Sequence, residues 1–447
     1  MRPINETAPV EVTVSCRPPP PWGQMRRHHI LIAILALVAG ACTDSASEPT
    51  ASTSTLIVTT TSTSPPTTSV MAPPEAALRI EIWTPQHLVV HVQRAATAFE
   101  IDTAIRVEVT PIGDETALET LLADPTSGPD IFIGPHSWLS VLTAAGVVEP
   151  IVARSEVVAG AVAAVTLRGV TFGAPLALDT IVQFRNADAL ALAPSTIESL
   201  AEGCPSGDDT VACLLLAADS VEGHYPFIAG LGGYIFGPDE FDEWAADDVG
   251  VDTADALAGG LILQSIVDGA GLLGDGSSTA EERFIDGIAP LLWGDTASLA
   301  TLQLGEANFT VEQLPTIGET PAPTPVRVTA AWVNAFSPGK EVALTFVSDY
   351  LADPSFADQI ALGLGMAPVN IGFAEDPDLV PFIEGAKTGD PIPTIFQTEY
   401  AWEQLAIAFD DIRSGDDPTE ALESAARAIR NPPEPEVPDE EDAEGGS

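Results

Sequence analysis

The sequence predicts an α/β fold divided into two domains. Segments with strand and helix patterns alternate from residue 78 onward, and over the first 70 or so residues this alternation favours a parallel sheet with right-handed crossovers. The chain has 447 residues. About 350 of them lie outside the terminal segments described below, which is too many for one hydrophobic core and suits two domains.

The first elements follow from hydrophobic periodicity. Leu78, Ile80 and Ile82 alternate with polar residues, which is typical of a strand. Further strands are expected at 105–109 and 130–133, and helices at 91–100, 116–122 and 138–145. Gly146 is well placed to cap the last of these helices at its C-terminus.

The later chain continues in the same style. Strands are expected at 181–184 and 288–293, and helices at 254–268, 341–351, 355–364 and 399–412, with a break at Asp353 and Pro354. Four prolines in residues 315–325 indicate a connection between domains.

A short apolar segment near the N-terminus indicates export. Residues 31–41 are apolar or small, follow the basic segment 25–29, and end at Cys42. This pattern is typical of a bacterial lipoprotein signal peptide. A permanent membrane helix is the alternative, but the run is shorter than the roughly 20 residues that a bilayer requires. We therefore expect residues 1–41 to be a signal peptide, with the true start at Met25, and Cys42 to carry the lipid.

Two segments lack the apolar residues needed for folding. Residues 42–76, rich in Ser, Thr and Pro, are expected to form a flexible linker between the lipid and the domains. Residues 431–447 are mostly acidic or polar and are expected to form a disordered tail. The protein is thus predicted to work on the outer face of the cytoplasmic membrane, periplasmic or extracellular, contacting the membrane only through its anchor.

The charge excludes one class of partner. The formal net charge is −48, with 65 acidic and 17 basic residues. Such a surface repels nucleic-acid backbones and anionic lipids, so no nucleic-acid partner is expected.

Cysteine usage agrees with export. Cys204 and Cys213 bracket a polar, turn-forming loop, and in an oxidising compartment they are expected to form a disulfide. A metal site is the alternative, but no His lies close in sequence and the spacing is not that of a zinc motif. No cofactor or metal is expected.

A series of short segments resembles the extracellular solute-binding proteins of sugar ABC transporters (family 1), in the same order and at similar spacing. The closest likeness within the family is to its maltose- and maltodextrin-binding members. The segments are LRIEIW at 78–83, AFEIDTAIRV at 98–107, SGPDIFIG at 127–134, AGVVEPI at 145–151, FGAPLALD at 172–179, FRNAD at 184–188, PFIAGLGGY at 226–234, VGVD at 249–252, FIDGIA at 284–289, NAFS at 334–337, MAPV at 366–369 and the helix around Trp402.

The resemblance implies a periplasmic-binding-protein-like fold, with two α/β lobes, a ligand cleft between them and three hinge crossings. The first lobe would hold residues 78–178 and 329–367, and the second 181–324 and 371–430. Hinges would lie near 178–180, 325–328 and 368–370. The implied function is capture of a maltodextrin-like carbohydrate by lobe closure, and its delivery by a monomer to the permease subunits of an ABC transporter, with no chemical step.

The resemblance also implies ligand-binding residues. Trp402 matches a position where a tryptophan stacks on the sugar, although its spacing to Leu405 and Phe409 also fits a core residue. Asp179 matches an acidic ligand-contacting position, with a turn-capping carboxylate as the alternative.

Other positions depart from the family pattern. His136 and Ser137 are candidate hydroxyl partners, and Trp138 is either a displaced stacking residue or a core residue. Gln86 and His87 stand where the family has an acid and a lysine.

The second lobe supplies further candidates. Glu222 and Tyr225 lie where the family has a carboxylate and an aromatic residue. Trp293 is either a stacking residue facing the cleft or part of the core, and Trp332, near a crossing in the first lobe, is a candidate to face the cleft.

The alternatives are a binding protein for a different solute and an extracellular hydrolase. The different solute would be another sugar, a polyol, or a cationic or zwitterionic molecule. A cationic or zwitterionic solute would suit the acidic surplus, whereas the aromatic positions favour sugars. No nucleophile elbow, zinc-protease motif or P-loop occurs in the sequence. We therefore expect a protein that is not an enzyme.

Overall fold

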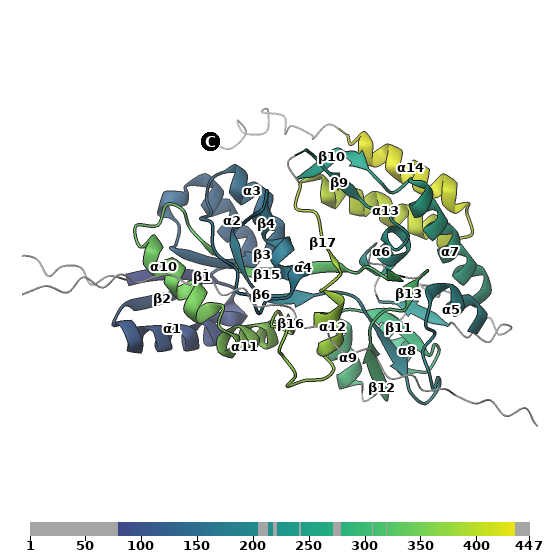
Figure 1. The fold of residues 1–447 in the computed structure, drawn as a ribbon, viewed down its shortest axis with the longest axis horizontal. Coiled ribbons are helices and arrows are strands. Elements are labelled where there is room, and N and C mark those ends of the chain that lie inside the picture. Colours follow the sequence, from purple (N-terminus) through teal and green to yellow (C-terminus); the bar gives the residue numbers. More distant parts are fainter. Residues whose placement is uncertain are drawn as a thin grey trace, which may run out of the picture. The chain divides into compact units, whose positions relative to one another are not determined.

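The structure is a computed structural model that describes residues 79–203, 213–217, 221–240, 243–270, 279–305, 307–318 and 320–433. The expected signal peptide, Cys42, the linker, Cys204 and most of the expected tail lie outside these residues. Two sheets dominate the described chain. The elements grouped about the larger sheet are called the first lobe below, and those about the smaller sheet the second lobe (Figure 1).

The first lobe is built on a seven-stranded sheet. Six of its strands follow the order β16-β6-β15-β3-β1-β2, and the seventh, β17, pairs with β15. Its strands are β1 (Arg79–Thr84), β2 (Arg106–Pro111), β3 (Ile131–Pro135), β6 (Gly173–Asp179), β15 (Pro325–Val333), β16 (Ala367–Pro368) and β17 (Asp390–Pro391). The predicted parallel arrangement holds for β1, β2 and β3. β15 lies outside the segment to which that prediction applied, and it runs antiparallel to both β3 and β6.

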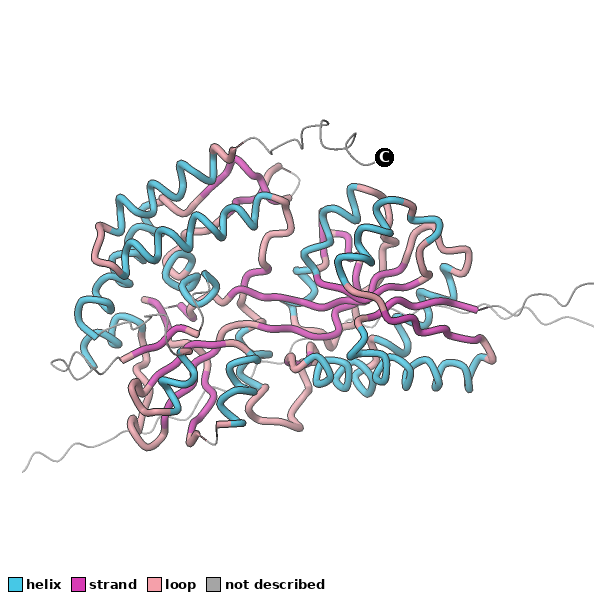
Figure 2. Tube along the Cα trace, turned by 180° about the vertical axis from the view of Figure 1, so that it is seen from behind, coloured by secondary structure: helices cyan, strands magenta, loops and turns pink. Residues whose placement is uncertain are grey.

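Helices cover both faces of this sheet (Figure 2). They are α1 (Val89–Thr103), α2 (Asp114–Ala123), α3 (Leu139–Ala144), α4 (Ala159–Ala164), α10 (Lys340–Phe346) and α11 (Pro354–Leu364). Short helical turns are η1 (Gln86–Leu88), η2 (Pro125–Ser127), η3 (His136–Trp138) and the π-helical turn η4 (Val347–Leu351). The small pair β4 (Thr166–Leu167) and β5 (Val170–Thr171) forms a hairpin.

The second lobe is built on a four-stranded sheet with the order β12-β7-β11-β8. Its strands are β7 (Val182–Asn186), β8 (Leu214–Leu216), β11 (Leu291–Gly294) and β12 (Phe309–Glu312). The small pairs are β9 (Phe236–Pro238) with β10 (Trp244–Val249), and β13 (Thr316–Ile317) with β14 (Thr320–Pro321).

The helices of the second lobe are α5 (Ile197–Gly203), α6 (Val221–Ala229), α7 (Ala254–Ala270), α8 (Ala280–Ile285), α9 (Thr296–Leu304), α13 (Gln397–Arg413) and α14 (Pro418–Arg430). Helices α13 and α14 pack against each other, and both contact α7 (Figure 1). Seven helices of the described chain were not predicted from the sequence: α4, α5, α6, α8, α9, α14 and the helix at 380–385. Most of them are short, whereas α14 has a clear apolar stripe that was overlooked.

Most predicted boundaries are confirmed within a few residues. Gly146 has a φ of 66°, the left-handed conformation that ends a helix. Asp353 caps α11 by accepting a hydrogen bond from the Ser355 amide, and Pro354 occupies the first turn. The proline-rich segment 315–325 leads from the second sheet into β15 of the first, as a connection should.

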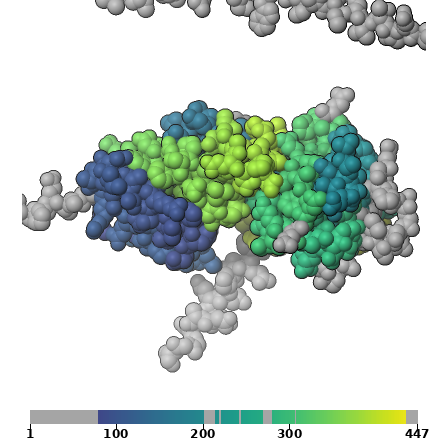
Figure 3. Space-filling model, turned by 90° about the horizontal axis from the view of Figure 1, so that it is seen from below, coloured from purple at the N-terminus to yellow at the C-terminus, as the bar shows by residue number. Residues whose placement is uncertain are grey.

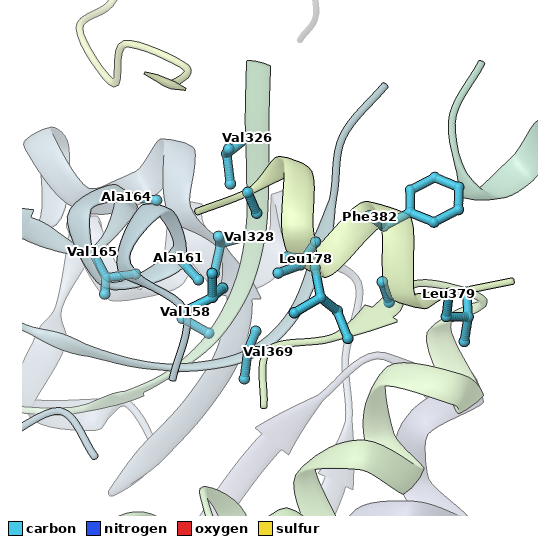
Figure 4. Close-up of a cluster of buried hydrophobic side chains, with 14 of the residues drawn as sticks. Val158, Ala161, Ala164, Val165, Leu178, Val326, Val328, Val369, Leu379 and Phe382 are labelled. Atoms are coloured by element: carbon cyan, nitrogen blue, oxygen red, sulfur yellow. The ribbon is translucent and has the colours of Figure 1, made fainter. Parts of the chain in front are cut away.

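A continuous apolar cluster joins the two lobes (Figure 4). Val326 and Val328 of β15 face this cluster, and Leu178 of β6 contributes from the neighbouring strand. Helix α12 (Val380–Gly385) contacts β6 and β16 of the first sheet and β7 of the second. On the face shown in Figure 3, the yellow-green segment that contains α12 lies between the blue first lobe and the green second lobe. The crossings between the sheets are therefore packed rather than loose.

One close contact between helices gives a sharp test of the second lobe. A Cβ atom on Gly259 of α7 would lie 1.6 Å from the backbone oxygen of Phe227 in α6, whereas one on Gly260 would lie 2.8 Å from the side-chain Cδ1 of Leu422. Gly259→Ala should therefore lower the free energy of unfolding by about 3 kcal/mol. Gly260→Ala should change it by less than about 1 kcal/mol, because Leu422 can rotate and Ala favours helix.

Urea unfolding followed by circular dichroism measures both variants. Equal stability of the two would show that α6 and α7 are not in this close contact.

Candidate ligand-binding cleft

A cluster of charged residues occupies the junction of the two lobes. In β15 the side chain of Arg327 alternates with those of Val326 and Val328, so it projects from the face opposite the apolar cluster. Arg327 is paired in register with Asp179, the last residue of β6. Its Nη2 donates to Asp179 Oδ2 at 2.7 Å. This ion pair joins β6 and β15, the strands at which the chain leaves the first sheet for the second and returns to it.

Two further carboxylates come from helix starts in the second lobe. Asp295 precedes α9, and its Oδ1 accepts from the amides of Ala297 and Ser298 as an N-cap. Its Oδ2 accepts from Arg327 Nη2 at 3.0 Å. Glu222, in the first turn of α6, lies 3.1 Å from Arg327 Nη1. One guanidinium therefore holds three carboxylates from two lobes.

Burial perturbs this cluster. Burial raises the pKa of Asp179 to about 6, although Arg327 and the Thr296 amide oppose the shift. Burial also raises the pKa of Glu222, again against the effect of Arg327. Burial alone would lower the pKa of Arg327, but the carboxylates outweigh it and the pKa lies above its usual value. The cluster is thus charged and partly shielded from water.

Four cavities share lining residues, and the segment after β17 lines all of them. The first lies against β9, β10, β17 and α13, whereas α3 lines the other three together with residues of the second lobe. We call them together the cleft. Their volumes are about 290, 480, 660 and 300 Å³. Trp402 lines the first and third, Trp244 lines the first, second and fourth, and Ile392 lines the first, third and fourth.

The first cavity is rich in aromatic side chains. Tyr225, Tyr234, Trp244 and Trp402 line it together with the carboxylate residue Asp390. Tyr225 donates its hydroxyl to Asp390 Oδ2 at 2.8 Å. Burial raises the pKa of Asp390, and the Tyr225 hydroxyl opposes that shift. The cavity offers apolar faces beside a few polar groups.

The third cavity is the largest of the four, and both lobes contribute polar groups to its mainly apolar wall. Ser137 and Ser140 come from the first lobe, and Thr398 and Trp402 from α13. Ser140 Oγ lies 2.5 Å from Thr394 Oγ1, which links α3 to the segment after β17. An ion pair between Arg168 and Glu243, with Nε 2.6 Å from Oε1, also joins the two lobes at the second cavity.

Three of the sequence-predicted ligand residues line the cleft, namely Trp402, Tyr225 and Ser137. Trp402 packs against the core of the second lobe and also lines two cavities, so the stacking and core interpretations each describe part of its surroundings. Asp179 and Glu222 line none of the four cavities and instead hold Arg327.

His136 has a structural position. It is buried, its Nδ1 accepts from the Val328 amide at 3.1 Å, and its Nε2 lies 3.2 Å from the Ile392 oxygen. Burial lowers its pKa to about 4, so the ring is neutral and donates from Nε2. The imidazole holds Ile392, which lines three of the cavities, against β15. Both of its nitrogens are engaged with the backbone, so it is not positioned as a partner for sugar hydroxyls.

Three predicted tryptophans are core residues. Trp138 packs on Phe132 and covers Gly134, where a Cβ would lie 2.1 Å from its ring. Trp293 and Trp332 are fully buried, and their indole nitrogens donate to Gln183 Oε1 and the Gly134 oxygen. None of the three lines any of the four cavities. Trp138 and Trp293 therefore take the core alternative, and Trp332 is a core residue and does not face the cleft as expected.

Gln86 and His87 are exposed on η1 and line none of the four cavities. Cys213 is disulfide-bonded, but its predicted partner Cys204 lies outside the described residues, so the pairing remains a prediction. Within the described ranges no group of three or more His, Cys, Asp or Glu side chains could hold a metal ion.

Four residues of this region were not predicted from the sequence. Arg327 is the centre of the charged cluster, and Trp244, Tyr234 and Asp390 line the first cavity. Nothing local distinguishes Arg327 in a strand of apolar residues, since its partners are up to 148 residues away. Trp244 lies in an acidic stretch without a clear period. The motif at 226–234 already contained Tyr234, although no role followed from it.

Comparison with known families identifies the chain. The family described as bacterial extracellular solute-binding protein matches residues 94–381, more than half of the sequence. The chain belongs to this family. No helix in the described part of the chain is long and apolar enough to span a bilayer.

Curated relatives of the chain are named as sugar-binding proteins. A galactooligosaccharide-binding protein of Bacillus subtilis (strain 168) is 22% identical over 372 residues, covering 78% of this chain and 88% of the relative. A maltotriose-binding protein of Pyrococcus abyssi (strain GE5 / Orsay) is 25% identical over 266 residues, covering 56% of this chain and 57% of the relative. A maltodextrin-binding protein of Bacillus subtilis (strain 168) is 22% identical over 350 residues, covering 73% and 82%.

Solved structures share the fold. A cyclo/maltodextrin-binding protein complexed with maltotetraose has a TM-score of 0.71 at 21% identity, covering 79% of this chain and 96% of that chain. An extracellular solute-binding protein from Staphylococcus aureus in complex with maltose has a TM-score of 0.72 at 20% identity, covering 78% and 96%. The predicted fold class is confirmed.

The raised pKa of Asp179 predicts a pH dependence of stability. A carboxyl with a pKa of about 6 when folded and about 3.9 when unfolded binds its proton more tightly in the folded state. Its contribution to stability is therefore complete below about pH 4 and is lost as the pH rises through about 6, by about 3 kcal/mol in total. Asp179→Asn should remove this decrease in the free energy of unfolding with rising pH. Urea unfolding between pH 4 and 7 measures the difference.

A control with the opposite sign is available. Hydrogen bonds from Thr126 lower the pKa of Asp124, so Asp124→Asn should remove stability that is present at pH 7 and absent at low pH. Parallel pH profiles for wild type and Asp179→Asn would contradict the assignment of a buried, raised carboxyl at the lobe junction.

Proposed function

We propose that the protein is a lipid-anchored, extracytoplasmic solute-binding protein that captures a carbohydrate between its lobes and delivers it unchanged to an ABC transporter permease. The observation that carries this proposal is the third cavity, where Trp402 of α13 lies with Ser137 and Ser140 of the first lobe. An indole offers an apolar face to a sugar ring, and hydroxyls match the polar rim of the ring.

The aromatic first cavity extends this surface. Tyr225 and Asp390, joined by their 2.8 Å hydrogen bond, stand beside Trp402. A carboxylate accepts hydrogen bonds from sugar hydroxyls more strongly than a neutral group does. Because both cavities share Trp402, a chain of two or more sugar units can occupy them together.

The similarities support an oligosaccharide as the ligand. The curated relatives are named for galactooligosaccharide, maltotriose and maltodextrin, and one solved neighbour holds maltotetraose. We propose an oligosaccharide of the maltodextrin kind as the first candidate and galacto-oligosaccharide as the second. Binding without turnover, by a monomer that is not an enzyme, follows from this role.

Lobe closure would use the three crossings that the family resemblance implies, near 178–180, 325–328 and 368–370. Hinge closure about a bound solute is a common switch. The apolar cluster in Figure 4 and the Arg327 cluster flank these crossings, so closure would rotate the lobes about a packed junction.

Isothermal titration tests the ligand class. Wild type should bind maltotriose or β-1,4-galactotriose with an affinity that Trp402→Ala weakens at least tenfold, because truncation removes the stacking face. Trp402→Phe should recover part of the loss. Heat of binding from spermidine alone, with none from any sugar, would contradict the carbohydrate assignment.

Lipid anchoring has its own test. In cells, the Cys42→Ala variant should leave the membrane fraction for the soluble extracytoplasmic fraction, because the thiol that carries lipid is missing. Retention of the variant in the membrane after a carbonate wash would indicate a spanning helix instead.

A further inference from the structure

An exposed phenylalanine stands at the start of α13. Phe396 is 78% exposed, whereas its neighbour Ile395 packs against the core of the second lobe. The Thr398 amide donates to the Ile395 oxygen at 3.1 Å, and the Thr398 hydroxyl donates to the Pro393 oxygen at 3.0 Å. These bonds fix the turn, so the aromatic ring is held outward by a rigid support.

This ring belongs to the third cavity. Phe396 and Trp402 line the same space of about 660 Å³, with Ser137 and Val141 of the first lobe also in its wall. Val141 is 38% exposed, so this wall is also open to water. Scattered apolar side chains on a surface need no explanation, but a large one that lines a cavity with a second aromatic residue marks a binding surface.

We propose that Phe396 is an outer stacking residue of the sugar site and makes the protein select for oligosaccharides longer than a disaccharide. This inference rests on the proposed function and names its substrate class more closely. The inner sugar units contact Trp402 and the first cavity, and a third or fourth unit lies on the ring of Phe396. The neighbouring hydroxyls of Ser137 and Thr398 supply polar partners along the same wall.

The continuity of the cavity decides between occupants. Beside Phe396 and Trp402, the wall carries the polar side chains of Ser137, Gln397 and Glu399 among apolar ones such as Val141 and Ile392. Alternating apolar faces and polar groups match a sugar chain. The shared cavity with Trp402 places such a chain within reach of both rings.

Ligand length provides the readout. Affinities for maltose, maltotriose and maltotetraose, and for β-1,4-galacto-oligosaccharides of the same lengths, are measured by titration calorimetry. In wild type the affinity should rise with length. Phe396→Ala should weaken binding of the tetrasaccharide by about five- to tenfold and of the disaccharide by less than about twofold. Phe396→Trp should retain the length preference.

Ile101→Ala is the matched control, because Ile101 is also 78% exposed but lies on α1 and lines none of the four cavities. Its affinities should equal those of wild type at every length. If Phe396→Ala binds every length as wild type does, the inference is overturned while the proposed function stands. If it keeps full affinity but fails in transport, Phe396 contacts the permease and the inference is also overturned. If wild type binds no sugar at all, the proposed function fails and the inference fails with it.

Discussion

The charge of Arg327 is the interaction on which the junction of the two lobes depends. Three carboxylates, from Asp179, Glu222 and Asp295, converge on its guanidinium, with distances of 2.7, 3.1 and 3.0 Å. Buried carboxylates at such separations would repel one another and lose their hydration without a shared counter-charge. Because these acids come from β6, α6 and α9, one side chain connects a strand of the first lobe to two helix starts of the second.

The same strand organises the floor of the cleft. The alternation of β15 sends Val326 and Val328 into the apolar cluster of Figure 4 and Arg327 to the other side. Backbone pairing of β15 with β17 then fixes the segment after Asp390, and His136 bridges the Val328 amide and the Ile392 oxygen. Since α13 begins a few residues later, the positions of Phe396 and Trp402 follow from the geometry of the crossing.

Local patterns in the sequence were sufficient for much of the fold. Alternation predicted β1 and β2, and a short apolar run predicted β3. A glycine predicted the end of α3, and the Asp353-Pro354 pair predicted the start of α11. The direction of β15 could not be predicted in this way, because it depends on a return from the other lobe. The charged cluster could not be predicted either, because Arg327 and Asp179 are 148 residues apart in sequence and meet only in the folded chain.

The aromatic residues show more clearly what local sequence patterns cannot predict. Trp138, Trp293, Trp332 and Trp402 all lay near expected ligand positions, yet the first three are buried and the last lines the cleft. Whether a ring faces a core or a cavity is decided by the packing of neighbouring elements, which periodicity does not report. No sequence pattern marked Phe396 or Trp244 as a cavity residue, because the cavities that they line form only when several elements pack together in the fold.

A crystal structure of the protein grown with maltotetraose or β-1,4-galactotetraose tests the central claim most directly. A sugar ring should stack on Trp402 between the lobes, with its hydroxyls in contact with first-lobe side chains such as Ser137. A sugar bound outside the cleft, or a cleft left empty while the crystals hold saturating oligosaccharide, would contradict it.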